Sequence, residues 1–189
     1  MLSLGIESAS DDLRQDMMKR LERQKIQTAF RNMREAGITS FAFFILGYPG
    51  DTAATIEQAT KYALELDPDF ANFYPAVPYP GTEMYEKCRR DGLLTTDDWS
   101  KLEYSYYVLR GNGLDEHIVM AAINRARRRF FLRPRYFVRH LGEIVRIALT
   151  NRGTVSEILS RIVFGRPLTD ATALGAPWSS ASPSPKTAL

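Results

Sequence analysis

The stretch TSFAFFILGYPGDT, residues 39–52, decides the fold. It begins as a continuous apolar run rich in Phe and Ile, a pattern typical of a strand buried on both faces of a parallel sheet. A turn with two glycines and a proline, residues 47–50, ends the run, and Asp51 or Thr52 can cap the helix that follows. The stretch therefore predicts a strand–loop–helix unit, in which ligands bind at the loop after the strand.

Similar units lie on either side of this stretch. Apolar runs at residues 2–6 and 70–77 predict two more strands. Residues 11–36 and 52–66 have apolar side chains at helical spacing, with a break in the first segment suggested near residues 20–24. These connections are long enough for right-handed parallel crossovers. The predicted fold class is α/β, with residues 1–94 forming a partial (β/α) barrel of about three parallel βα units.

The rest of the chain has a different character. Residues 95–165 are predicted to form a mainly α-helical C-terminal extension, because long amphipathic segments occupy residues 115–132 and 134–150. Residues 155–164 suggest a third helix. Residues 166–189 are rich in Ala, Ser, Pro and Thr, a composition that buries too little apolar surface to fold, so we expect a disordered tail.

Composition narrows the class of protein. The 189 residues are 44% hydrophobic and 25% charged with a net charge of +3, which is ordinary for a soluble domain. No apolar run reaches the length of a membrane span and no signal-peptide pattern is present, so we expect a cytoplasmic protein. The single cysteine, Cys88, excludes a cysteine-only metal site within this sequence, and His117 and His140 lack ligand spacing, so no metal site is predicted.

The chemically informative residues follow the three predicted strands. They are Glu7 and Ser8 after the first strand, residues 47–50 after the second, and residues 78–81 after the third. The carboxyl ends of parallel strands lie at one edge of a sheet. Three loops far apart in sequence are therefore predicted to meet at one site.

Four segments, in order and spacing, resemble the second half of a radical S-adenosylmethionine core. They are GIESAS (residues 5–10), REAGI (34–38), FFILGYPGDT (43–52) and ELDPDFANFYPAVPYPGTEMY (65–85). The likeness is to the subset that carries a cobalamin-binding domain, which includes hopanoid-biosynthesis and anaerobic cyclase-type members. FFLRPRYF, residues 130–137, resembles the helical C-terminal region of that subset, so the resemblance covers about residues 2–140.

The resemblance implies both an activity and missing parts. The family fold has six βα units, and a CxxxCxxC loop in the first unit binds a 4Fe–4S cluster that reduces S-adenosylmethionine to a 5′-deoxyadenosyl radical. This sequence resembles units four to six and contains neither CxxxCxxC nor the Gly-Gly-Glu stretch that holds the methionyl amine. We therefore expect the C-terminal portion of such an enzyme, inactive alone. Its cluster, and cobalamin where used, would be bound by an upstream half as partner.

The resemblance also assigns cofactor-binding residues, each with a structural alternative. Glu7 and Ser8 would reach the ribose hydroxyls and the carboxylate end of the cofactor, or else they cap the helix that begins near Ser10. Ile45 and Gly47 match part of the strand motif GxIxGxxE that lies against the adenine, with Pro49 in the same loop. In that motif Phe43 replaces the first glycine. The alternative is a tight turn with no ligand.

The third loop would complete the site. By the resemblance, Val77 and Pro78 contact the adenine through their backbone, and Tyr79 lines the substrate cavity together with Tyr48 of the second loop. The alternative is a turn stiffened by its prolines. We expect a small-molecule or lipid-like substrate, changed by radical chemistry at an unactivated C–H bond.

Clustered arginines suggest a second function, a non-catalytic binding module. They are Arg125, Arg127, Arg128, Arg129, Arg133, Arg135, Arg139 and Arg146. They could bind nucleic acid, the less expected partner, or a membrane surface beneath which Phe130, Phe131, Phe137 and Ile144 insert. They could also be the solvated faces of packed helices.

Overall fold

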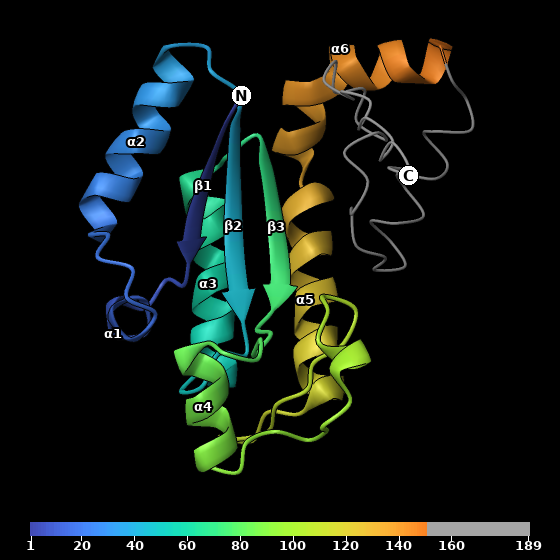
Figure 1. The fold of residues 1–189 in the computed structure, drawn as a ribbon. Coiled ribbons are helices and arrows are strands. Elements are labelled where there is room, and N and C mark those ends of the chain that lie inside the picture. Colours follow the sequence, from blue (N-terminus) through green and yellow to red (C-terminus); the bar gives the residue numbers. More distant parts are fainter. Residues whose placement is uncertain (151–189) are drawn as a thin grey trace, which may run out of the picture.

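The computed structural model describes residues 1–150 and contains one parallel sheet. Its strands are β1 (Leu2–Glu7), β2 (Ser40–Leu46) and β3 (Phe70–Pro75), in the order β1-β2-β3. All three point the same way in Figure 1, with helices between them along the chain. The predicted α/β fold with three parallel βα units and C-terminal helices is confirmed. The helix suggested at residues 155–164 and the tail at 166–189 lie outside the described residues.

The helices begin and end near their sequence signals. They are α1 (Asp11–Asp16), α2 (Arg23–Glu35), α3 (Ala53–Leu66), α4 (Glu83–Arg90), the short 3₁₀ helix η1 (Trp99–Lys101), α5 (Glu116–Phe131) and α6 (Pro134–Thr150). Side chains of Ser10, Thr52, Thr82 and Asp115 accept hydrogen bonds at four N-termini. The helical segment predicted over residues 11–36 is broken between α1 and α2, slightly earlier than the break suggested near residues 20–24. Met18 lies in this break with a φ of +57°, which no α-helix accommodates.

The main core lies between one face of the sheet and the helices α3 and α5. Ala42, Phe44 and Leu46 of β2 point to this face and are buried. Phe73 of β3 stacks on Phe44 and meets Phe130 of α5 edge to face at 6.5 Å between ring centroids. Burial of each such ring contributes about 2–3 kcal/mol, so this face holds the fold together.

The opposite face of the sheet, which we call the inner face, is only half-buried. Burial alternates along β2, so Phe41, Phe43 and Ile45 remain partly exposed. The prediction that this strand is buried on both faces is correct for the face covered by helices and wrong for the inner face. Rings stack along the inner face, with centroids 4.9 Å apart for Phe41 and Phe43 and 6.1 Å apart for Phe43 and Tyr74.

Arginines of the C-terminal helices make specific contacts with the sheet and its helices. Arg127 is buried and donates to the Phe73 carbonyl at 2.9 Å, and Arg129 pairs with Glu57 at 2.6 Å. Phe130 and Phe131 belong to the core, which removes them from the suggested membrane-inserting set. The side chains of Ile144 and Arg146 lie outside the described residues. The contacts of Arg127 and Arg129 indicate a packing role for these two residues.

Asp67 fastens the start of α6 to the end of α3. Its buried carboxylate pairs with Arg133 at 2.7 Å, Arg135 at 3.3 Å and Arg139 at 2.5 Å. Arg34 of α2 donates to the Asp67 carbonyl at 3.1 Å. Asp67 also caps α3 with a φ of +49°, a conformation that Asp and Asn tolerate better than most residues. Arg34 Nη2 also lies 3.9 Å from the carboxylate, so one carboxylate balances four guanidinium groups.

We predict that Asp67→Asn lowers the free energy of unfolding by about 1–3 kcal/mol, because four guanidinium groups lose their shared anion. The loss stays below that of a fully buried pair since Arg135 is largely exposed. Urea unfolding measures it. The matched control is Glu57→Gln, which removes a more exposed pair with Arg129 and should cost less than about 1 kcal/mol. Equal losses in both variants would contradict the central role of Asp67.

Candidate functional site

The three loops predicted to form a site do lie at one edge of the sheet. The strands are parallel neighbours in register, with Gly5 opposite Phe43 and Phe43 opposite Asn72. Their carboxyl ends therefore share the edge at the tips of the arrows in Figure 1. This edge carries Glu7 and Ser8, the loop of residues 47–51, and residues 77–79.

Glu7 has a conformation that the sequence did not indicate. Its φ is +63°, and the register of β1 against β2 shifts between Gly5 and Glu7. A Cβ at Gly5 would collide with Glu7 Oε1, so the carboxylate folds back over Gly5 on the inner face. Lys19 Nζ holds it at 2.9 Å. A left-handed conformation costs a residue other than glycine about 1–2 kcal/mol, and such strain concentrates at functional sites.

Ser8, in contrast, is bonded into the protein. Its buried hydroxyl accepts from the Ser10 amide at 3.2 Å, and its carbonyl accepts from Arg14 Nη1 at 2.6 Å. Ser10, and neither Glu7 nor Ser8, is the N-cap of α1. Arg14 is itself buried, also donates to the Leu21 carbonyl at 3.0 Å, and pairs with Asp11. Nothing in the sequence distinguishes Arg14 from an exposed helical arginine.

Asp51 shapes the loop after β2. Its buried carboxylate accepts from the amides of Gly47 at 2.9 Å and Tyr48 at 3.0 Å and from the Thr55 hydroxyl at 2.5 Å. Burial raises the pKa of Asp51 above its usual value, while these three hydrogen bonds act in the opposite direction. Thr52 then caps α3. Of the two predicted caps, Thr52 serves the helix and Asp51 closes the loop.

Tyr107 lies against the same loop from a distant part of the chain. Its hydroxyl donates to the Gly47 carbonyl at 2.9 Å, and a Cβ at Gly47 would lie 2.5 Å from Tyr107 Cε2. Burial and the nearby Asp51 carboxylate raise the pKa of Tyr107 well above its usual value, so the hydroxyl stays protonated. The resemblance places Gly47 in a strand motif that lies against the adenine. In the structure, the missing side chain of Gly47 makes room for Tyr107.

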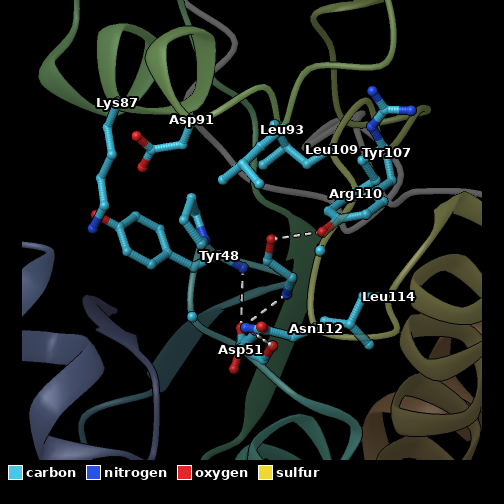
Figure 2. Close-up of a pocket in the computed structure, with 14 residues that line it drawn as sticks. Tyr48, Asp51, Lys87, Asp91, Leu93, Tyr107, Leu109, Arg110, Asn112 and Leu114 are labelled. Carbon is cyan, nitrogen blue, oxygen red and sulfur yellow. Dashed lines mark hydrogen bonds between the residues drawn. The ribbon is translucent and has the colours of Figure 1, made fainter.

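A cavity of about 300 Å³ opens beside this loop, at the lower end of the range for small-molecule sites. Figure 2 shows that its walls come from the loop after β2, the end of α4 and the segment 107–114. The lining residues are Gly47, Tyr48, Pro49, Gly50, Asp51, Lys87, Asp91, Leu93, Tyr107, Leu109, Arg110, Gly111, Asn112 and Leu114. The cavity thus combines apolar walls with charged groups at its rim.

The remaining predicted site residues lie outside this cavity lining. Ile45 is half-buried on the inner face, Val77 is half-buried, and Pro78 is buried after β3. The exposed Tyr79 has its pKa raised by partial burial and by a hydrogen bond with Tyr104. Because Tyr104 packs on Tyr74 at 4.6 Å between centroids, Tyr79 lies near the inner face.

Tyr48, the other residue predicted to line a substrate cavity, turns away from the inner face. It is buried in the cavity wall with its hydroxyl 3.5 Å from the Asp16 carbonyl at the end of α1. Burial raises the pKa of Tyr48 to about 12.

Residues 1–150 contain potential metal ligands, one of which is a cysteine. Cys88 of α4 is fully buried, and burial raises the pKa of its thiol to about 11. Within residues 1–150, His, Cys, Asp and Glu side chains form no group of three or more that could hold a metal ion. In the same part of the chain, no helix is both long and apolar enough to cross a membrane.

Comparison with known proteins identifies relatives, although no family model matches the sequence. An uncharacterized methyltransferase, PH0819 of Pyrococcus horikoshii, is 30% identical over 149 residues, which cover 77% of this chain and 32% of that protein. The anaerobic magnesium-protoporphyrin IX monomethyl ester cyclase of Cereibacter sphaeroides is 28% identical over 137 residues, which cover 72% of this chain and 22% of that protein. The bacteriochlorophyllide d C-8(2)-methyltransferase of Chlorobaculum tepidum is 27% identical over 89 residues, which cover 47% of this chain and 20% of that protein.

These homologues are radical S-adenosylmethionine-type proteins, and the predicted resemblance is confirmed. The chain spans about a third of the length of the Pyrococcus relative and about a fifth of the other two. At the level of the family, the relationship implies use of S-adenosylmethionine and an iron–sulfur cluster.

We predict that Gly47→Ala destabilises the protein more than Gly81→Ala does. The two glycines have matched φ values of +80° and +83°, but a Cβ at Gly81 meets nothing within 4 Å. Both variants pay the backbone cost of about 1–2 kcal/mol, and only Gly47→Ala also displaces Tyr107, for about 1–3 kcal/mol more. Urea unfolding of the two variants measures the difference. Equal losses would show that Tyr107 moves aside freely.

Proposed function

We propose that this chain forms the adenosyl side of the S-adenosylmethionine site in a radical S-adenosylmethionine enzyme. The observation that carries the proposal is the position of Glu7, whose strained backbone places a carboxylate on the inner face at the edge where the three loops meet. A carboxylate accepts hydrogen bonds from two neighbouring hydroxyls at once, as the ribose of the cofactor requires.

The surroundings of Glu7 fit an adenosyl group. Ile45 and Val77 offer half-buried apolar side chains at the same edge, suited to one face of a flat ring. The loop of residues 47–51 is held in shape by Asp51, and a cavity opens beside it. Lys19 keeps the Glu7 carboxylate on the inner face. The bound cofactor would supply radical chemistry at a C–H bond, while these residues would bind and orient its adenosyl part.

The cluster requires ligands beyond this sequence. In the family that the sequence resembles, three thiolates of a CxxxCxxC loop hold the cluster. The present sequence contains one cysteine, Cys88, which lies in the core. In our proposal the cluster, and cobalamin as in the related subset, are bound by a partner segment or chain. That partner is the upstream half of the same enzyme, and the present chain is inactive without it.

The inner face supports an apolar substrate with lipid-like or pigment-like character. Phe41, Phe43, Phe70 and Tyr74 stand along it with stacked rings, partly open to solvent. Two of the relatives are named for a magnesium-protoporphyrin ester and a bacteriochlorophyllide. Aromatic side chains bury large apolar surfaces and favour ring contacts, so an apolar ring system is the substrate class that suits this face.

We predict that the purified chain binds 5′-deoxyadenosine and S-adenosylmethionine weakly, and that Glu7→Gln weakens both about tenfold, since a hydrogen bond to a charged acceptor contributes about 1.5–3 kcal/mol. Amide shifts in nuclear magnetic resonance titrations measure affinity and locate the ligand. The matched control is Glu22→Gln, an exposed residue paired with Lys25. Absence of saturable shifts at the strand ends in the wild-type chain would overturn the proposal.

A peripheral membrane module is the second candidate, and exposed apolar side chains on α6 favour it. Val138 is 77% exposed and Leu141 58%, with Phe137 beside them. We expect Val138→Asp to abolish co-sedimentation with anionic lipid vesicles if this function is real, and Thr28→Asp on α2 to leave it unchanged. A wild-type chain that stays in the supernatant would eliminate the candidate.

A further inference from the structure

We infer that Tyr107 and Asn112 are positioning residues, which hold the loop of residues 47–51 in the shape that receives the adenosyl group. Both belong to the segment that follows α4, outside the three βα units. The inference rests on the proposed function. It concerns how the site is built, and it assigns a role to a part of the chain that carries none of the family motifs.

Tyr107 fixes the first residue of the loop. Its hydroxyl donates to the Gly47 carbonyl at 2.9 Å, and its ring occupies the space where a side chain at position 47 would lie. The Gly47 amide is bonded to Asp51 at 2.9 Å. Both backbone polar groups of Gly47 are therefore engaged, and the residue cannot rotate without breaking two buried hydrogen bonds.

Asn112 fixes the last residue of the loop. Its Nδ2 donates to the Asp51 carbonyl at 3.2 Å. Asn112 lies in a tight turn with a φ of +50°, closed by hydrogen bonds between Gly111 and Leu114 at 2.8 and 3.2 Å. Asn adopts this conformation more readily than most residues. The turn therefore holds the side-chain amide of Asn112 in a fixed position beside the loop.

The loop of residues 47–51 needs these hydrogen bonds because its two glycines make its backbone flexible. Gly47 and Gly50 have φ values of +80° and +104°, and glycine has access to many other conformations. Two contacts from residues some 60 positions later select one of them. Preorganisation of this kind improves affinity because the loop is ordered before the ligand binds.

The contacts of Tyr107 and Asn112 also explain why the loop of residues 47–51 and the segment 107–114 line one cavity. Six of its lining residues come from the segment 107–114 and five from the loop of residues 47–51. Figure 2 shows Tyr107 and Asn112 meeting the loop from this segment. A boundary at residue 94 describes the order of elements along the chain, whereas the cavity beside the loop of residues 47–51 is lined from both sides of that boundary.

The test compares Tyr107→Phe, which removes only the hydroxyl, with the neighbouring exposed Tyr106→Phe as matched control. A second variant, Asn112→Ala, removes the other tie from an exposed turn. We expect Tyr107→Phe and Asn112→Ala each to weaken binding of 5′-deoxyadenosine about five- to tenfold. Amide hydrogen exchange in residues 47–51 should accelerate about tenfold. Exchange at Ala42 and Phe44 in the core of β2 should accelerate much less than exchange in residues 47–51, whereas a general loss of stability would accelerate both equally.

The outcomes separate this inference from the proposed function. A wild-type chain that fails to bind 5′-deoxyadenosine overturns the proposed function, and the positioning role falls with it. A wild-type chain that binds, with both variants binding equally well and exchanging at the same rate, overturns the positioning role alone. Equal acceleration at Ala42 and at residues 47–51 would also overturn it, because the contacts would then support the whole fold.

Discussion

The candidate site depends on the two hydrogen bonds at Gly47. The Asp51 carboxylate accepts a hydrogen bond from the Gly47 amide, and the Tyr107 hydroxyl donates one to the Gly47 carbonyl, both at 2.9 Å. Both partners are buried, so the full cost of an unpaired polar group opposes any other arrangement. Only glycine allows the approach of the Tyr107 ring. The end of β2, the start of α3 and the segment after α4 are thereby joined at one residue.

The sequence was sufficient for the framework of the fold. The apolar run at residues 40–46 and the turn signals after it give β2 and α3 almost to the residue, because strong local preferences and burial agree there. The inner face was misjudged. A run of Phe and Ile looks the same whether one or both faces are covered, and coverage depends on where α5 packs, which no local pattern records.

The meeting of the three loops at one edge was predictable from the sequence, but the details of their structure were not. The topology of parallel strands places Glu7, Gly47 and Val77 at one edge, and this followed from the order of elements alone. The left-handed backbone of Glu7 and the contact of Tyr107 with Gly47 depend on tertiary packing. Arg14 illustrates the same limit, since its burial follows from the bend between α1 and α2 that brings Leu21 within hydrogen-bonding distance.

In our proposal, stability and ligand binding belong to different parts of the same sheet. The helix-covered face and the amino-terminal edge, where Asp67 gathers its arginines, contain the close-packed rings and the paired charges. The inner face and the carboxyl edge contain a strained glutamate, half-exposed aromatic rings and a loop with two glycines in left-handed conformations. Residues that bind ligands must be both exposed and held in a fixed geometry. The close-packed, helix-covered face is rigid and can therefore hold the backbone of Glu7 in its strained conformation. This division matches the loop of residues 47–51, where Gly47 is held by a buried tyrosine and a buried aspartate, while the groups that we propose for ligand binding are more open.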